Sequence, residues 1–183
     1  MNLTKVPMHH RHKYTLEQQR ESKFAPHVRC KGPHIRGFEG IIRTVIYPDH
    51  IDNDGKIKVE AIPSRDLTKI GWSVNRLMYV TKGQIDSLVE GYVERKTERV
   101  LSGHSLFIAD DMRRIVDQYG FQAFVIRDSA CAPEERAHAL VFCSGKYKKS
   151  EVKQLRWKLI EKMTPQHPTD KILKFRELFP AAK

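Results

Sequence analysis

The chain has few cysteines and no long apolar run, and each shortage argues against a class of protein. Its 183 residues include only three cysteines, and an odd number at wide spacing does not suit a disulfide-stabilised secreted domain. No apolar run approaches the roughly 18 residues that a membrane-spanning helix needs. The N-terminal sequence MNLTKVPMHHRHK lacks the apolar core of a signal peptide. We therefore expect a cytoplasmic protein in a reducing compartment.

Motifs that mark common chemistries are also missing. The sequence contains no Gly-rich phosphate loop, no paired Cys-x-x-Cys and no His-Glu-x-x-His. These absences remove P-loop nucleotide hydrolysis and a closed zinc site from the leading hypotheses. No cofactor is expected, and the sequence resembles no known family.

Positive charge is what the chain has in excess, and it is concentrated at the two ends. The formal net charge is +11. Residues 1–36 hold eight Lys/Arg against two acids, residues 146–183 hold eleven against four, and the stretch between holds fourteen against sixteen. Clustered cations favour a polyanionic partner, because binding releases counterions from a phosphate backbone. Nucleic acid, DNA or RNA, is the expected partner, and a membrane surface is not, because no helix pairs an apolar face with aromatic anchors and a basic face.

The composition predicts one folded domain behind a basic extension. Hydrophobic residues make up 40% of the chain and charged residues 30%, which is typical of globular proteins. We expect a His-rich N-terminal extension over residues 1–36 and a single α+β domain over residues 37–183, ending in basic helices.

Hydrophobic periodicity places the expected elements. Five segments have the β-branched or alternating pattern of strands: 41–47, 56–62, 72–80, 121–127 and 138–143. The first two are expected to form a hairpin around the turn signal Asp-Asn-Asp-Gly at 52–55. Four segments have helical periodicity: 84–97, 110–119, 149–163 and 169–179. This order predicts an antiparallel or mixed sheet of about five strands with helices packed on one side.

The helix expected over residues 149–163 is the main candidate binding surface. Its apolar residues form one stripe, and Trp157 falls outside that stripe with Lys153 one turn away. An indole face suits bases and ammonium groups suit phosphates. The candidate nucleic-acid contacts are Lys146, Lys148, Lys149, Lys153, Arg156 and Trp157, with Arg11, Lys13 and Arg29 secondary. The alternative is a solvated basic helix whose tryptophan is covered by the last helix.

Three residues form a candidate catalytic set. A metal-independent nuclease needs a general base, a general acid and a cation at the phosphate. His104, Arg127 and His138 fill these roles if the fold brings them together. His138 opens an expected strand and Arg127 closes its partner, whereas His104 is expected in a loop between helices. The alternative is that these are ordinary hydrogen-bonded polar residues.

The sequence also offers weak signals for metal binding and an alternative in which the partner is a protein. The group His9, His10 and His12, and the group His27, Cys30 and His34, have spacings that only weakly resemble metal sites, so no metal is predicted. An adaptor subunit whose basic segments dock an acidic protein is the third functional hypothesis.

Overall fold

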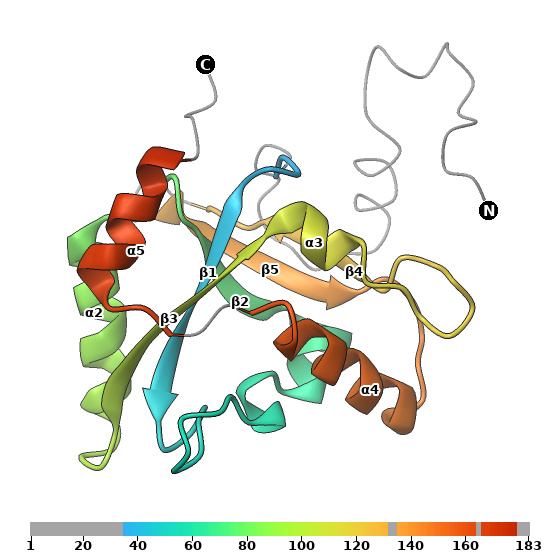
Figure 1. The fold of residues 1–183 in the computed structure, drawn as a ribbon, viewed down its shortest axis with the longest axis horizontal. Coiled ribbons are helices and arrows are strands. Elements are labelled where there is room, and N and C mark those ends of the chain that lie inside the picture. The colour runs from blue at the N-terminus through green and yellow to red at the C-terminus, as the bar shows by residue number, and fades with distance from the viewer. Residues whose placement is uncertain (1–34, 132–134, 164–165, 179–183) are drawn as a thin grey trace.

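The computed structural model describes residues 35–131, 135–163 and 166–178, which form an antiparallel sheet flanked by helices (Figure 1). The five strands are β1 (Gly40–Tyr47), β2 (Trp72–Arg76), β3 (Val100–Ile108), β4 (Phe124–Asp128) and β5 (His138–Cys143). Their order across the sheet is β3-β1-β2-β5-β4. The helices are α2 (Lys82–Val93), α3 (Ala109–Arg113), α4 (Lys149–Ile160) and α5 (Thr169–Phe175), with short helical segments η2 (Val59–Ala61), η3 (Asp66–Ile70) and η5 (Arg176–Leu178). The predicted α+β class is confirmed.

Helices cover both faces of the sheet, so the expected one-sided arrangement is wrong in this detail. One buried cluster joins strand residues to α3 and α4: Ile41, Phe107, Met112, Leu155 and Leu159. The other joins the alternate strand residues to α2 and α5: Ile42, Leu106, Ile85 and Ile172. Neighbouring strand residues point to opposite faces, and here both faces are apolar and need cover. Figure 1 shows α2 and α5 together at the left and α4 at the lower right.

The second predicted strand does not form. The turn is present, since the Asp52 carboxylate accepts hydrogen bonds from the backbone N–H groups of Asp54 and Lys56. A single bridge, Ile51 to Ile57, follows it before the chain enters the short helical segment η2. Residues 56–62 cannot form the expected hairpin with β1, because β1 already pairs with β2 on one side and with β3 on the other.

The strand β3 takes the place of the loop expected around His104. Gly103 has a φ of 136°, and a Cβ there would lie 2.8 Å from the carbonyl oxygen of His167. The glycine therefore lets the chain before α5 pair along this edge, where His104 and His167 exchange two backbone hydrogen bonds of 2.8 Å. The strand was not predicted because the polar sequence Ser-Gly-His-Ser interrupts the apolar pattern.

A buried ionic cluster joins β2 and β4 to Glu39, the residue that precedes β1. The Arg76 guanidinium donates to both carboxylate oxygens of Glu39, at 2.7 and 2.9 Å, and also pairs with Asp128. All three side chains are buried, and the Tyr79 ring lies 4.5 Å from the guanidinium carbon. A buried arginine with two carboxylate partners links the segments that carry them and is not available as a surface cation.

Two further observations bear on the expected environment. No helix in the described ranges is long and apolar enough to cross a membrane. Cys143 is a free, buried thiol, whereas Cys131 is disulfide-bonded. One bridge is not the multi-disulfide framework that the cysteine spacing argued against, but it does not favour the expected reducing compartment.

Candidate nucleic-acid interface

The helix α4 has one buried face and one basic face. Val152, Leu155 and Leu159 are buried against the sheet. At the helix start, the Glu151 carboxylate accepts a 2.6 Å hydrogen bond from the backbone N–H of Lys148. This anchoring is typical of a helix N-terminus and fixes which side chains point outward.

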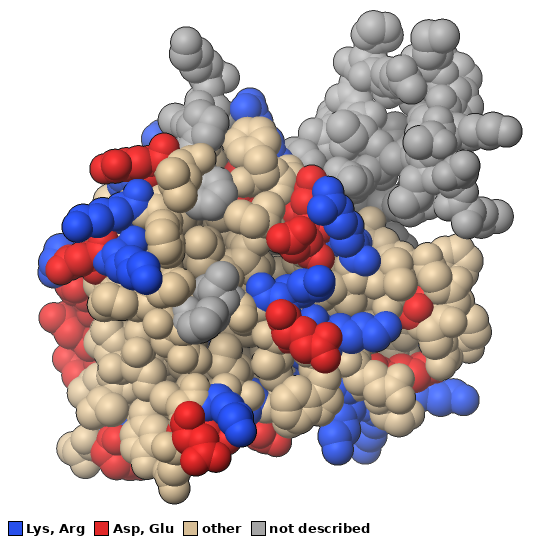
Figure 2. Space-filling model, in the orientation of Figure 1, with Lys and Arg blue, Asp and Glu red and all other residues tan. Residues whose placement is uncertain are grey.

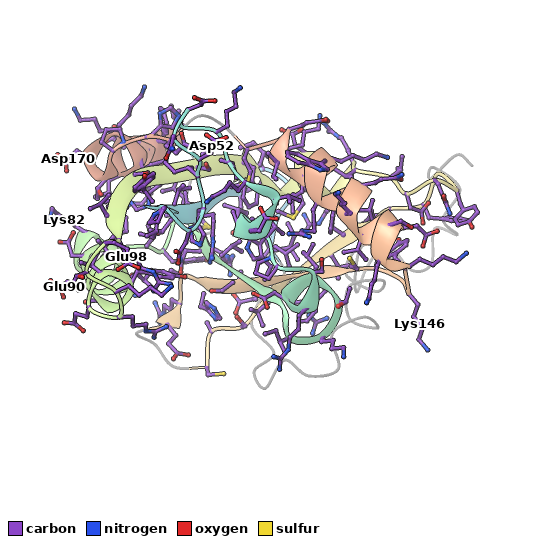
Figure 3. All side chains as sticks on the ribbon, turned by 90° about the horizontal axis from the view of Figure 1, so that it is seen from below. Asp52, Lys82, Glu90, Glu98, Lys146 and Asp170 are labelled. Carbon is purple, nitrogen blue, oxygen red and sulfur yellow. The ribbon has the colours of Figure 1, made fainter. Side chains whose placement is uncertain are left out.

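The outward face of α4 and the segment that leads into it carry most of the residues that the sequence singled out. The side chains of Lys146, Lys148, Lys149 and Lys153 are exposed, and none of them has an ion pair or side-chain hydrogen bond within the described part of the chain. Trp157 is 45% exposed, so the last helix does not cover it. Figure 3 shows Lys146 extending from the end of the molecule opposite Lys82 and Asp170.

Arg156 is placed differently from the lysines. Its guanidinium donates to the Ser64 hydroxyl at 2.9 Å and to the Val59 carbonyl oxygen, so it ties α4 to the segment around η2. Burial lowers the pKa of this guanidinium, although the Glu60 charge acts in the other direction. At most part of this side chain is available to a ligand.

Beside α4 lies a turn formed by residues 116–121, here called the aromatic turn. Tyr119 is 70% exposed and Phe121 58% exposed. The Asp117 carboxylate accepts hydrogen bonds from the backbone N–H groups of both, at 2.8 and 3.0 Å, and Gly120 has a φ of 79°. Burial alone would raise the pKa of Asp117, but these two hydrogen bonds, with help from Tyr147 and Lys158, lower it. The turn is therefore held by its own backbone while it presents two rings to solvent.

Three contacts join the aromatic turn to α4 and the segment that leads into it. Lys158 Nζ donates to the Val116 carbonyl oxygen at 2.9 Å, and Gln118 Nε2 donates to a Glu151 carboxylate oxygen at 2.6 Å. The Tyr147 hydroxyl donates to Asp117 at 3.1 Å. Figure 1 shows this yellow turn beside the orange segment that enters α4. The basic helix and the exposed rings thus form one surface.

A pocket of about 640 Å³ opens between the aromatic turn and the start of α4. Its lining includes both exposed rings, two lysines and the base of the turn: Asp117, Tyr119, Phe121, Gln122, Val125, Ser144, Tyr147, Lys146, Lys148 and Glu151. Sequence reasoning missed this site because the helix expected over 110–119 includes most of the turn, whereas α3 ends at Arg113. The signal that could have found it is Asp-Gln-Tyr-Gly-Phe, in which an Asp and a Gly frame a turn.

The candidate catalytic residues share a sheet face but do not form one site. Arg127 pairs with Leu140, two residues from His138, so Arg127 and His138 lie on the same face of adjacent strands. His104 lies on β3, with β1 and β2 between it and β5, a separation of about 14 Å at the usual strand spacing. It is fully buried, and its ring nitrogens contact Thr44 and Thr169 hydroxyls at 3.2 and 3.1 Å. The residue is positioned as a link between β1, β3 and α5.

His138 is tied to serines on both sides. Its Nε2 lies 2.9 Å from the Ser73 hydroxyl and its Nδ1 lies 2.7 Å from the Ser129 hydroxyl. Burial lowers the pKa of His138 although Glu135 acts in the opposite direction, so the ring is neutral at pH 7. A neutral imidazole has one donor and one acceptor, and both are used here.

A second cleft, of about 580 Å³, runs between α2 and the β2–β5 pair. His138 and Glu135 contribute to its wall, and so does Asn75, whose side-chain amide has no hydrogen-bond partner in the described part of the chain. Neither Arg127 nor His104 lines it. The cleft therefore does not assemble the proposed catalytic set.

The remaining expectations fall outside the described residues or find no support within them. Arg11, Lys13 and Arg29, and the histidines of the extension, lie outside the described ranges. Within those ranges no group of three or more His, Cys, Asp or Glu side chains could hold a metal ion. In comparisons with known proteins, no family model, curated protein or solved structure matches this chain.

Proposed function

We propose that the protein binds nucleic acid, contacting the phosphate backbone through its basic N- and C-terminal segments, with α4 as the described part of the interface. One observation carries the proposal: four exposed lysines, on α4 and in the segment that leads into it, have no side-chain partner among the described residues and accompany a half-exposed tryptophan on the same helix, whose other face is buried. A phosphate backbone supplies the missing partners for the lysines, and a base can cover the indole.

The local charge balance supports this proposal more than the whole surface does. Residues 146–160 contain six Lys/Arg and one acid, Glu151. That acid already accepts hydrogen bonds from Lys148 and Gln118. On the face drawn in Figure 2, however, Lys and Arg alternate with Asp and Glu and form no continuous basic field. The expected interface is therefore a local one, with a small number of phosphate contacts.

The test compares two triple variants that remove the same charge. Lys148, Lys149 and Lys153 are changed to Ala in one, and Lys56, Arg95 and Lys96, which are also exposed, in the other. Binding of fluorescent DNA and RNA oligonucleotides is measured by anisotropy at low salt. The first variant should lose at least tenfold in affinity and the second should change little. Equal losses would indicate attraction to net charge alone, and no binding by the wild type would refute the proposal.

The placement of Arg127 and His138 on one face of adjacent strands keeps nuclease activity as a second candidate function. Incubating an end-labelled oligonucleotide with the wild type and with His138→Ala tests it, because only the wild type should cleave. If the protein neither binds nor cleaves nucleic acid but captures an acidic protein, the adaptor hypothesis takes its place. We retain the cytoplasm as the proposed location on the basis of the nucleic-acid hypothesis.

A further inference from the structure

The geometry points to a preference for single strands: the pocket between the aromatic turn and the start of α4 holds an unpaired base of the nucleic acid. This inference rests on the proposed function, and it assigns the base contacts to Tyr119 and Phe121, two residues that the proposed phosphate contacts do not include.

The exposure of the two rings is built into the turn. Tyr119 and Phe121 are 70% and 58% exposed although they belong to residue types that proteins usually cover. A loosely held loop could fold such rings back onto the body. Here Asp117 fixes the backbone on both sides of Gly120, and Tyr147 and Lys158 fix the turn to its neighbours. Rings that are rigid, exposed and adjacent to a pocket form a stacking platform with little entropy to lose on binding.

The charges around the pocket set the direction in which a nucleotide enters. The two carboxylates in the lining are engaged: Asp117 accepts from two backbone N–H groups and a hydroxyl, and Glu151 from Lys148 and Gln118. The two lysines of the lining, Lys146 and Lys148, are exposed. A phosphate is attracted to the lysines and repelled by the carboxylates, so the base faces inward and the phosphate lies outward.

The size of the pocket leaves room for a base from a single strand. Its volume of about 640 Å³ lies in the range of small-molecule sites. In a duplex the bases are stacked on each other and paired inside the helix, so they cannot enter a pocket on a protein that contacts the backbone. A single strand has free base faces, and every base has one, so this mode discriminates strandedness rather than sequence. Trp157 lies further along α4, outside the pocket, and offers a longer strand a third ring.

The test uses the Tyr119→Ala/Phe121→Ala double variant of the full chain. The turn's hydrogen bonds come from backbone N–H groups, so alanines preserve them. Affinity is measured by anisotropy for a 20-nucleotide oligo(dT) and for the 20-base-pair duplex dA·dT. We expect at least a tenfold loss for the single strand and less than a twofold change for the duplex. Phe38→Ala is the matched control, because Phe38 is 44% exposed elsewhere on the chain and should leave both affinities unchanged.

An oligo(dT) containing abasic sites identifies stacking directly. Abasic substitution should weaken wild-type binding, and the penalty should shrink to less than twofold in the double variant. An abasic penalty that persists unchanged, or equal losses for single strand and duplex, would overturn the base pocket while leaving the proposed function intact. If the wild type binds no nucleic acid at all, it is the proposed function that fails. If it binds normally and the double variant matches it for the single strand, the base pocket is refuted.

Discussion

Trp157 is the residue at which contributions to binding and to folding can be separated. Because the side chain is 45% exposed and α5 does not cover it, Trp157→Ala should leave the unfolding free energy nearly unchanged. The same change should weaken single-strand binding by about 1–3 kcal/mol, the usual worth of one base stack. Chemical denaturation and anisotropy on the same preparation measure both quantities. A large stability loss with unchanged binding would contradict this assignment.

Fluorescence gives an independent measurement of Trp157. Trp72, the other tryptophan, is fully buried and donates its indole N–H to the Ala61 carbonyl oxygen, so replacing it would disturb the core. The difference between wild-type and Trp157→Phe spectra isolates Trp157 without that disturbance. We expect this difference spectrum to be red-shifted in the free protein and quenched by oligo(dT).

His104 should make the fold sensitive to mild acid. Burial lowers the pKa of His104 from 6.5 to about 4. Between pH 6.5 and pH 4, His104 is therefore protonated in the unfolded chain but neutral in the folded protein. Stability should therefore fall as the pH drops from 6.5 to 4, by on the order of 2–3 kcal/mol from this group. Burial lowers the pKa of His50 to about 4 as well, and it adds a similar dependence. Urea unfolding at pH 7 and pH 5 should show a smaller difference for His104→Gln than for the wild type.

At the residue scale, sequence spacing placed Trp157 outside the apolar stripe, about 140° from Val152, and left open whether the last helix covers it. The structure leaves Trp157 45% exposed, which favours the alternative in which the last helix does not cover it. Val116 and Tyr119 also fitted a helical stripe, yet α3 ends at Arg113 and leaves them in the turn. The Asp117 carboxylate accepts hydrogen bonds from backbone N–H groups that a helix would use. Hydrophobic periodicity gives no information on such side-chain to backbone hydrogen bonds.

At the element scale, α4 offers a direct test of its two faces. Leu155 is buried in the main cluster, so Leu155→Asp places an unpaired charge in the core and should unfold or severely destabilise the protein. Lys153 is exposed and has no side-chain partner among the residues that the structure describes, so Lys153→Glu should leave the melting temperature nearly unchanged and weaken nucleic-acid binding. Thermal unfolding and anisotropy separate the two effects. Similar stability losses in both variants would mean that the faces are assigned incorrectly.

Four of the five strands and all four helices follow from local patterns with shifted ends. The strand that was missed and the strand that was wrongly expected have a common cause. Residues 56–62 alternate like a strand but have no free edge, whereas 100–108 have polar interruptions but pair with β1 and bridge to His167. Whether a marginal segment becomes a strand depends on the available neighbour, which sequence periodicity does not contain.

At the scale of the whole molecule, the fold divides the basic C-terminal segment. The charges at the start of α4 lie at one end, where Figure 3 labels Lys146, and Asp170 marks α5 at the other. α5 packs with α2 on the opposite sheet face from α4. The count of charges by sequence segment groups α4 and α5 together, whereas the fold places the two helices on opposite faces of the sheet.

A local interface has a consequence for the salt dependence of binding. Each phosphate neutralised by a lysine contributes a slope of about −0.7 for single strands in a plot of log affinity against log salt concentration. Wild-type binding should therefore show a slope of several units, and the Lys148/Lys149/Lys153→Ala variant a slope smaller in magnitude by about 2, three times the single contribution. The Lys56/Arg95/Lys96→Ala control should keep the wild-type slope, because long-range attraction of net charge is largely screened at 0.1 M salt, where the Debye length is about 10 Å. Titrations of oligo(dT) between 50 and about 300 mM NaCl measure all three slopes over the range in which counterion release operates. Equal slopes for both variants would show that α4 does not provide the phosphate contacts, and a flat wild-type slope would remove phosphate recognition altogether.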